Sequence, residues 1–492
     1  HSQEKETMTR IGIYGVSTQS GHAYLTDCLS IGVEVYGYAR SSQHGTEAVT
    51  TLMQQGGIYR QRPGNNIEET SAFLPLGAGE VGHDLERLID VSDIIILAHP
   101  AQYQEESARR LKEAGLLEGG GVLLVLSPSR TLATPYLWRI LGEQYPVISF
   151  QTCPYSCKSS SPGSTYIKRR KKSWMASVEG DVSGRALAAL KGIFPQTLTS
   201  GLPATTSLGN IGAVFHPTTY LLNWDAILAA DKANTTFPFY LEGIARNVKV
   251  ASVIEEIDQT RLRIAHALGI SVFGLQGDPR EQEWASIMKE VPKSRASGSS
   301  IQELRRLRAV HLQPIHDSVV SAQHWLDYTY GATRIPGEPL SDAIGRTSTY
   351  QRRSYPQERY IHEDIPTGLV PLESLAERFG IPHEAMTRII DLYQDVTGMD
   401  GRKTGRNLEP FKTGYLKQYL LGRLGAEGEQ ELCAGNVGKR PTYSGAVQGL
   451  AHCPESGHRR ATCSTGNNGS GDHGAHSARR SRLRRPELQA QP

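Results

Sequence analysis

The chain has 492 residues, of which 38% are hydrophobic and 21% charged, and its formal net charge is +3. This length allows two domains with sizeable cores, and the nearly balanced charge gives no indication of a nucleic-acid partner. No run reaches the ~18 apolar residues that a membrane-spanning helix needs, so we expect no membrane partner. Six cysteines without framework spacing fit a reducing compartment, and we expect a cytoplasmic protein. Cys153 and Cys157 have no second close pair in the folded region, so no metal site is predicted.

The first predicted unit is a strand over residues 10–15, a small-residue turn, a helix over 22–30 and a strand over 33–39. This order is the βαβ unit of dinucleotide-binding folds. In the turn, Gly15-Val-Ser-Thr-Gln-Ser-Gly21, serines replace the later glycines of G-x-G-x-x-G, and a serine hydroxyl can donate to a phosphate. A plain strand-to-helix turn is the alternative. The predicted cofactor contacts here are Gly15, Ser17, Thr18, Gln19 and Ser20.

The end of the second strand indicates which cofactor the chain binds. An enzyme specific for NAD usually carries an acid there, whereas this chain has Arg40-Ser41-Ser42. A guanidinium beside two hydroxyls suits a 2′-phosphate, so we predict NADPH or NADP as the cofactor. The alternative is that Arg40 is a solvated loop arginine.

Three further buried strands are predicted over residues 93–98, 121–126 and 147–150, with a helix over 104–114. The segments that follow these strands, 99–103, 127–130 and 151–155, should share the sheet edge where ligands bind. This adds His99, Pro100 and Ser127 to the predicted cofactor contacts. A basic run in residues 166–176 predicts a solvated edge strand.

After Pro203 the apolar residues take helical spacing. The predicted helices cover residues 217–230, 239–268, 280–291, 301–326 and 371–397. The wide apolar face of 301–326 leads us to expect a homodimer through this domain. We predict a nucleotide-binding domain over residues 9–200, a helical domain over 201–434 and a disordered or appended tail over 435–492.

His216 stands directly before Pro217, which favours the first position of a helix. An imidazole held at a helix entrance is well placed as an acid or base, although a core or capping histidine is the alternative. Asp364 belongs to an acidic pair, Glu363-Asp364, that we expect in a loop. Asp364 either caps a helix or lies in solvent, or it orients an imidazole and raises the pKa of that imidazole.

These motifs resemble the octopine/nopaline (opine) dehydrogenase family. The resemblance runs from about Thr9 to Gly425, and its specific part is N-x(5)-H-P-x(4)-L-N with E-D-I-P-x-G-L-V-P-L. The turn Gly-Val-Ser-Thr-Gln-Ser and Arg40 look most like the opine-metallophore branch, which makes staphylopine, pseudopaline or yersinopine. The resemblance implies an α/β fold: a Rossmann-type doubly wound sheet followed by an all-α catalytic domain.

It further implies NADPH-dependent condensation of an amine with an α-keto acid, with His216 as the acid/base supported by Asp364. Arg130, Lys158 and Arg359 are candidates to bind substrate carboxylates. The predicted substrate contacts are Gln151, Asn210, Thr219, Tyr220, Asn223 and Arg359. Two other functions stay open: a 6-phosphogluconate or hydroxyacid type dehydrogenase, and a non-catalytic NADP-sensing protein.

Overall fold

The computed structural model describes residues 9–61, 72–77, 79–118, 120–159, 161–171, 174–270, 274–275, 335, 337–347 and 356–424. The helices expected over 280–291 and 301–326, the dimer face assigned to the latter, and the tail over 435–492 all lie outside these ranges. Among the helices of the described ranges, none is long and apolar enough to cross a membrane.

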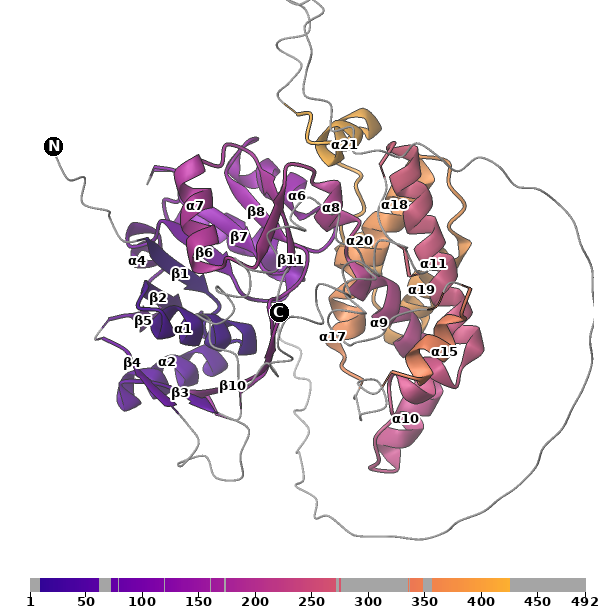
Figure 1. The fold of residues 1–492 in the computed structure, drawn as a ribbon, viewed down its shortest axis with the longest axis horizontal. Coiled ribbons are helices and arrows are strands. Elements are labelled where there is room, and N and C mark those ends of the chain that lie inside the picture. Colours follow the sequence, from indigo (N-terminus) through magenta and orange to yellow (C-terminus); the bar gives the residue numbers. More distant parts are fainter. Residues whose placement is uncertain are drawn as a thin grey trace, which may run out of the picture. The chain divides into compact units, whose positions relative to one another are not determined.

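An eight-stranded sheet forms the centre of the first part of the chain, drawn in indigo to magenta in Figure 1. Its strands lie in the order β12-β11-β8-β7-β6-β1-β2-β5. The bounds are β1 (Arg10–Tyr14), β2 (Glu34–Tyr38), β5 (Val81–Gly82), β6 (Ile94–Leu97), β7 (Leu123–Leu126), β8 (Val147–Phe150), β11 (Trp174–Glu179) and β12 (Thr197–Ser200). From β5 across to β8 the strands are parallel, and β11 is antiparallel to β8. The predicted Rossmann-type sheet is confirmed.

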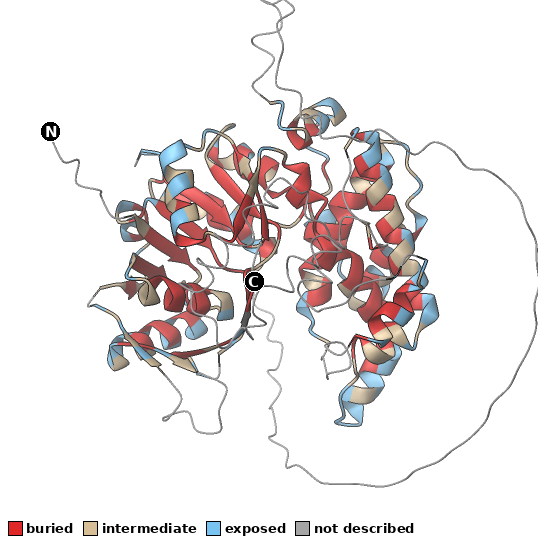
Figure 2. Cartoon of the chain, viewed as in Figure 1, coloured by how far each residue is buried: buried red, intermediate tan, exposed pale blue. Residues whose placement is uncertain are grey.

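Helices cover both faces of this sheet. They are α1 (Gln19–Ser30), α2 (Gln43–Gln55), α4 (Leu85–Asp90), α5 (Gln104–Glu113), α6 (Ala133–Leu141) and α7 (Gly184–Ile193), with a 3-10 turn η1 (Ala101–Tyr103) before α5. Strand β6 shows how the sequence supports both layers. Ile94 and Ile96 pack in the core with α1, α2 and α7, while Ile95 and Leu97 pack in the core with α4, α5 and α6. A continuous apolar run is therefore needed, and Figure 2 shows the strands buried.

A second sheet of four strands lies in the order β4-β3-β10-β9. The bounds are β3 (Gly57–Gln61), β4 (Ala72–Pro75), β9 (Tyr155–Lys158) and β10 (Ser164–Arg170). The prediction of a solvated edge strand is wrong for β10, which pairs with β3 on one side and β9 on the other. Arg170 is buried because its guanidinium meets Asp27 of α1, with Nη2 2.8 Å from Oδ1. A basic side chain can be buried when a buried carboxylate compensates its charge.

The second part of the chain is built from helices. They are α8 (Ala204–Ser207), α9 (Ile211–Leu222), α10 (Trp224–Lys232), the π-helix η2 (Leu241–Ala245), α11 (Val248–Ala267), α15 (Leu340–Gly345), α17 (Arg359–His362), the π-helix η5 (Ile365–Leu369), α18 (Val370–Arg378), α19 (Glu384–Thr397), α20 (Gly401–Thr404) and α21 (Thr413–Leu420). The stretches expected as single helices over 217–230 and 371–397 are each divided into two. Figure 1 shows α9 among the other helices of this part.

His216 lies within α9 rather than at a helix entrance. The helix begins at Ile211, and Pro217 stands inside it. Proline removes one backbone bond, to the carbonyl four residues earlier. Burial of an apolar side chain such as Phe215 or Leu221, each worth roughly 1.5–3 kcal/mol, offsets that loss. The expected position at the first helical turn is therefore wrong, and the acid/base candidate sits on a helix that is already formed.

Arg406 joins the loop after α20 to the nucleotide-binding part. Its guanidinium donates to the Glu105 carboxylate at 2.8 Å and to the Gln104 side chain at 3.0 Å. It also donates to the carbonyl oxygens of Ala101, Ser129 and Thr131. A buried charge with so many acceptors is well satisfied, and it fixes the strand ends relative to the helices.

We expect Arg170→Met to lower the free energy of unfolding by about 3–5 kcal/mol, because Asp27 would keep its charge in the core without a partner. Urea unfolding followed by circular dichroism measures the loss. In Arg170→Met/Asp27→Leu most of it should return, since no lone charge remains. Arg10→Met, which breaks an exposed pair with Asp93, should cost no more than about 1 kcal/mol. Equal losses in the single and double variants at Arg170 would contradict this account.

Candidate active site

The turn after β1 is shaped for close approach of a ligand. Gly15 has φ of 95°, a left-handed conformation that favours glycine. A Cβ on Gly21 would lie 2.1 Å from the Gly15 carbonyl oxygen, so α1 packs onto the turn only without a side chain there. The chain leaves β1 for β2 on one side, and β6 lies on the other side of β1. This reversal is the place where dinucleotides bind in such sheets.

The hydroxyl groups of Thr18 and Ser20 bind the turn to the end of β6. Thr18 Oγ1 donates to the Ala98 carbonyl at 2.6 Å, and Ser20 Oγ donates to the same oxygen at 2.9 Å. Thr18 Oγ1 also accepts from Gly21 N–H and so caps α1. In this structure the Ser20 hydroxyl is directed at the Ala98 carbonyl, and its contact with a phosphate stays a prediction. Backbone N–H groups at Ser17 and Gln19, at the N-terminus of α1, are the donors that suit an anion.

The segment Arg40-Ser41-Ser42 follows β2 and leads into α2. Ser42 is the N-cap of α2, where its hydroxyl accepts from Gly45 N–H at 3.1 Å. Arg40 pairs with Glu106 of α5 at 2.9 Å, and both side chains are more than a third exposed. Ser41 is exposed. The three residues therefore surround the N-terminus of a long helix, with a partly solvated guanidinium beside it.

Of the predicted contacts at the ends of β6 and β7, His99 and Ser127 are buried and Pro100 is half-buried. His99 Nε2 accepts from the Ser107 hydroxyl at 2.9 Å, and burial lowers the pKa of His99 to about 4. The Ser127 hydroxyl is 2.6 Å from the Tyr24 hydroxyl. Pro100 precedes the η1 turn. His99 is neutral at physiological pH, and it packs 3.3 Å from where a Cβ on Gly15 would lie.

His216 and Asp364 form a buried pair in the helical part. Nδ1 of His216 donates to Oδ2 of Asp364 at 2.8 Å, and the two side chains are 14% and 1% exposed. A carboxylate only accepts, so Nδ1 carries the proton and Nε2 is left for another partner. Asp364 stands between α17 and η5, in continuous helical structure. The expected loop is wrong, because Ile365 to Leu369 are buried against α9 and fold as a helix.

Two neighbours of Asp364 complete its surroundings. Arg130, after β7, lies 3.2 Å from Oδ1 of Asp364, an ion-pair distance without hydrogen-bond alignment. Nε of Arg130 also donates to Oε1 of Glu363 at 3.2 Å. The same Glu363 oxygen accepts from Ala101 N–H at 3.1 Å. Both carboxylates of the acidic pair are therefore buried and compensated.

The pKa of His216 lies below its ordinary 6.5. Burial lowers it, the hydrogen bond and charge of Asp364 raise it by less, and Arg359 and Arg130 lower it further. The expectation that the carboxylate raises this pKa above the ordinary value is wrong, because desolvation of the ring is the larger effect. Burial raises the pKa of Asp364, but Arg130, His216 and Arg359 together lower it by more, so Asp364 is ionised.

Aromatic rings enclose His216. The Tyr360 ring stacks on the imidazole with centroids 4.0 Å apart, and the Tyr240 hydroxyl lies 3.4 Å from Nε2. Phe239 lies 6.5 Å from it, measured between ring centroids. Tyr360 precedes Asp364 by one helical turn, a spacing that could have indicated it in the sequence. No sequence signal indicates Tyr240.

The predicted substrate residues divide into three groups. Asn210 accepts from Arg130 at 3.3 Å and so lies beside the pair, while Gln151 donates to the Gly209 carbonyl, next to Asn210 in the chain, at 3.0 Å. Thr219, Tyr220 and Asn223 are buried along α9, where Thr219 donates to Phe215 and Asn223 donates to Thr219 and Gly243. Arg359 is half-exposed above the Tyr360 ring, with its Cζ 5.2 Å from the centroid.

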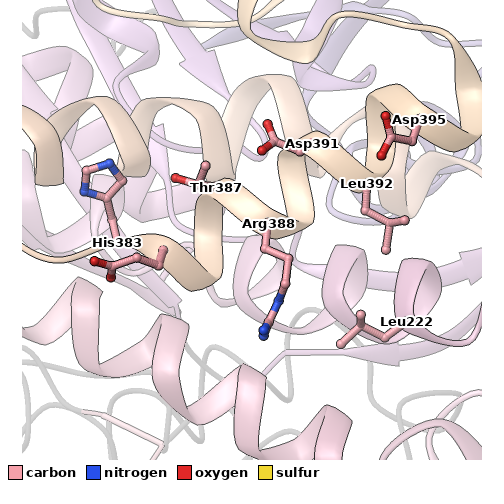
Figure 3. Close-up of a pocket in the computed structure, with 8 residues that line it drawn as sticks. Leu222, His383, Thr387, Arg388, Asp391, Leu392 and Asp395 are labelled. Atoms are coloured by element: carbon pink, nitrogen blue, oxygen red, sulfur yellow. The ribbon is translucent and has the colours of Figure 1, made fainter.

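A pocket of about 560 Å³ lies along α19 and is drawn in Figure 3. It is lined by Leu222, His383, Glu384, Thr387, Arg388, Asp391, Leu392 and Asp395. None of these is a predicted site residue, and neither His216 nor Asp364 lines it. Within the described ranges, no group of three or more His, Cys, Asp or Glu residues is placed to hold a metal ion.

The chain is similar to known dehydrogenases in sequence and in fold. Residues 202–397 match the family described as NAD/NADP octopine/nopaline dehydrogenase, alpha-helical domain. An opine dehydrogenase of Arthrobacter sp. (strain 1C) is 24% identical over 359 residues, which cover 70% of this chain and 84% of that protein.

Two solved structures share the fold at low identity. Octopine dehydrogenase with NADH and agmatine has a TM-score of 0.57 at 18% identity and covers 84% of this chain and 95% of its own. NADP+-bound yersinopine dehydrogenase has a TM-score of 0.55 at 14% identity and covers 85% of this chain and 98% of its own. The chain thus has the fold of these dehydrogenases, a Rossmann-type sheet followed by a helical domain, and its residues 202–397 match the helical domain of the octopine/nopaline dehydrogenase family.

Proposed function

We propose that this chain is an NADPH-dependent opine dehydrogenase, which condenses an amine with an α-keto acid and reduces the resulting imine. The observation that carries the proposal is the buried His216–Asp364 pair. It lies in the part that matches the family of helical domains, beside residues that follow the strand ends of the nucleotide-binding part. The related structures hold NADH with agmatine, L-arginine or pyruvate, or hold NADP+.

The turn after β1 fits a dinucleotide. Gly15 and Gly21 leave room for a backbone approach, and the N-terminus of α1 offers N–H donors to a diphosphate. When bound, the nicotinamide supplies the hydride that reduces the C=N carbon. The chain's own residues bind and orient the partners, exclude water and move protons.

His216 is the proton-transfer group in this proposal. The amine adds to the keto carbon, and the carbinolamine loses water to give the imine. The imidazolium donates its Nε2 proton to the departing oxygen, while Nδ1 stays bonded to Asp364. The Tyr360 stack fixes the ring plane, and burial keeps competing water away. In the reverse, oxidative direction the neutral ring accepts the proton.

The preference for NADPH rests on the end of β2. A 2′-phosphate at the α2 N-terminus would meet the helix N–H groups, the hydroxyl of Ser41 and the guanidinium of Arg40. The Arg40–Glu106 pair is solvated, so exchanging that carboxylate for a phosphate costs little.

The substrates we propose are a histidine-containing, nicotianamine-like amine and α-ketoglutarate or pyruvate, giving an opine metallophore. The support is the resemblance of the phosphate turn and of Arg40 to that branch. Asn210, Gln151 and Arg359 are the proposed substrate contacts: Asn210 lies beside the pair, Gln151 contacts the preceding residue Gly209, and the guanidinium of Arg359 is half-exposed. We further propose a homodimer and the domain boundaries 9–200, 201–434 and 435–492.

A substrate matrix tests the function. NADPH oxidation at 340 nm is followed with amines, including histidine-derived ones, L-arginine and agmatine, each with pyruvate and α-ketoglutarate. Turnover should need both an amine and a keto acid, and mass spectrometry should find the secondary amine product. Reduction of the keto acid alone would point instead to a hydroxyacid dehydrogenase, and cofactor binding without turnover to a sensing protein.

Arg40→Asp should weaken NADPH binding at least about tenfold more than NADH binding, because a phosphate contact becomes a repulsion. Fluorescence titration of both cofactors gives the two Kd values. Arg109→Asp, an exposed change of the same charge on α5, is the control and should alter neither. Equal losses for both cofactors would remove Arg40 from the cofactor site.

His216→Asn should cut turnover by about 10²–10⁴-fold, the usual contribution of a positioned proton-transfer group, and leave NADPH binding nearly unchanged. His362→Asn is the matched control, because this histidine bonds Tyr393 instead. Near-normal turnover in His216→Asn would leave the proposal without its acid.

Asp364→Asn should give a smaller loss and move the pH dependence. A carboxylate favours the imidazolium, so its removal lowers the pKa of His216 further. The reductive rate needs the imidazolium and falls as pH rises through that pKa, so the fall should move to lower pH. A rate-against-pH series at saturating substrates measures it, and an upward movement would contradict the assignment.

A further inference from the structure

Arg130 reaches from the nucleotide-binding part into the His216–Asp364 pair. It follows β7 with φ of 64°, a conformation that is unfavourable for any residue but glycine. Its side chain is 12% exposed and contacts Glu363, Asp364 and the Asn210 side chain at 3.2–3.3 Å. Such a backbone persists only where the surroundings hold it, and these three partners all belong to the helical part.

Helix α9 is shaped to admit this guanidinium. A Cβ on Gly212 would lie 2.8 Å from Nη1 of Arg130 and 3.4 Å from Oδ2 of Asp364. Gly212 precedes His216 by one helical turn, so the bare backbone, the guanidinium and the imidazole lie along the same side of α9. Nearby, a Cβ on Gly368 of η5 would lie 2.4 Å from Ala213 Cβ, which allows η5 to bring Asp364 up to the helix.

We propose that Arg130 is a positioning residue of the active site: from the nucleotide-binding part it holds Asp364 in place, and its own positive charge beside the pair shifts His216 toward the neutral imidazole. Its role in turnover rests on the proposed function, whereas the contacts stand without it. Nε and Nη1 of Arg130 already donate to Glu363 and Asn210, and Nη1 lies at ion-pair distance from Asp364. The acid/base pair is therefore assembled from both parts of the fold.

The direction of the effect follows from the charges around the pair. Asp364 faces His216 of α9, Arg130 after β7 and Arg359 of α17. His216 faces Asp364, Arg130 and Arg359, and its Nε2 faces the hydroxyl of Tyr240. Arg130 lowers the pKa of both His216 and Asp364, so removing its charge should raise both values.

The experiment compares Glu363→Gln with Arg130→Gln/Glu363→Gln. Removing Arg130 alone would leave two buried carboxylates uncompensated and endanger folding. The double variant removes a charge of each sign, and Glu363→Gln keeps an acceptor for Ala101 N–H. The readout is the titration of the His216 imidazole by NMR in ¹³C-histidine-labelled protein, assigned by its loss in His216→Asn. This readout needs neither cofactor nor turnover.

We expect the His216 titration midpoint to lie about one pH unit higher in the double variant than in Glu363→Gln. This is the lower end of the effect that a nearby charge has on a pKa. In Arg130→Lys/Glu363→Gln the charge is restored, and the midpoint should return toward that of Glu363→Gln. An unchanged midpoint in the double variant would overturn the proposal.

Arg170→Met/Asp27→Leu is the control, since it also removes a buried charge pair but has no contact with the residues beside Arg130. It touches neither Asp364 nor His216, so its His216 midpoint should stay at the wild-type value even if the protein is less stable. A shift as large as that of the Arg130 variant would show a general loosening and overturn the proposal. An NMR shift without turnover on any substrate pair would support the positioning role while refuting the proposed function.

Discussion

Two adjacent carboxylates, Glu363 and Asp364, are buried to 2% and 1% exposure, and the active-site region is arranged around compensating them. An uncompensated charge in the interior costs several kcal/mol, so each oxygen needs a cation or a donor. Asp364 takes His216 and Arg130, while Glu363 takes Arg130 and the Ala101 N–H. Arg130 and Ala101, at the strand ends of the nucleotide-binding part, thus supply part of this compensation.

The same requirement explains the two π-helices at the site. Asp364 is the residue before η5, and Tyr240 is the residue before η2. A π-helical turn adds a residue to the ordinary helical register and often occurs at functional sites. The residue before each π-helix faces the His216 ring: Asp364 contacts Nδ1, and Tyr240 lies near Nε2.

In the nucleotide-binding part, the turn after β1 is held by polar side chains that form hydrogen bonds within the protein. Thr18 and Ser20 fix the phosphate turn to the end of β6 through the Ala98 carbonyl. Two glycines, Gly15 and Gly21, then supply the space that the substituted positions of the motif do not. Ser20 and Thr18 of the degenerate glycine motif thus hold the turn in place in this structure.

The sequence by itself determined the sheet, because buried parallel strands need continuous apolar runs such as Ile94–Leu97, and it determined which helix and which acidic pair to examine. It did not determine that Pro217 lies inside α9 or that Asp364 is helical, since both depend on burial against distant segments. Tertiary structure alone decided that Arg170 is buried, that burial lowers the pKa of His216, and that Arg130 meets Asp364. Local patterns record what each residue favours, whereas the partner of a buried charge lies far away in the chain, 143 positions for Arg170 and 233 for Arg130.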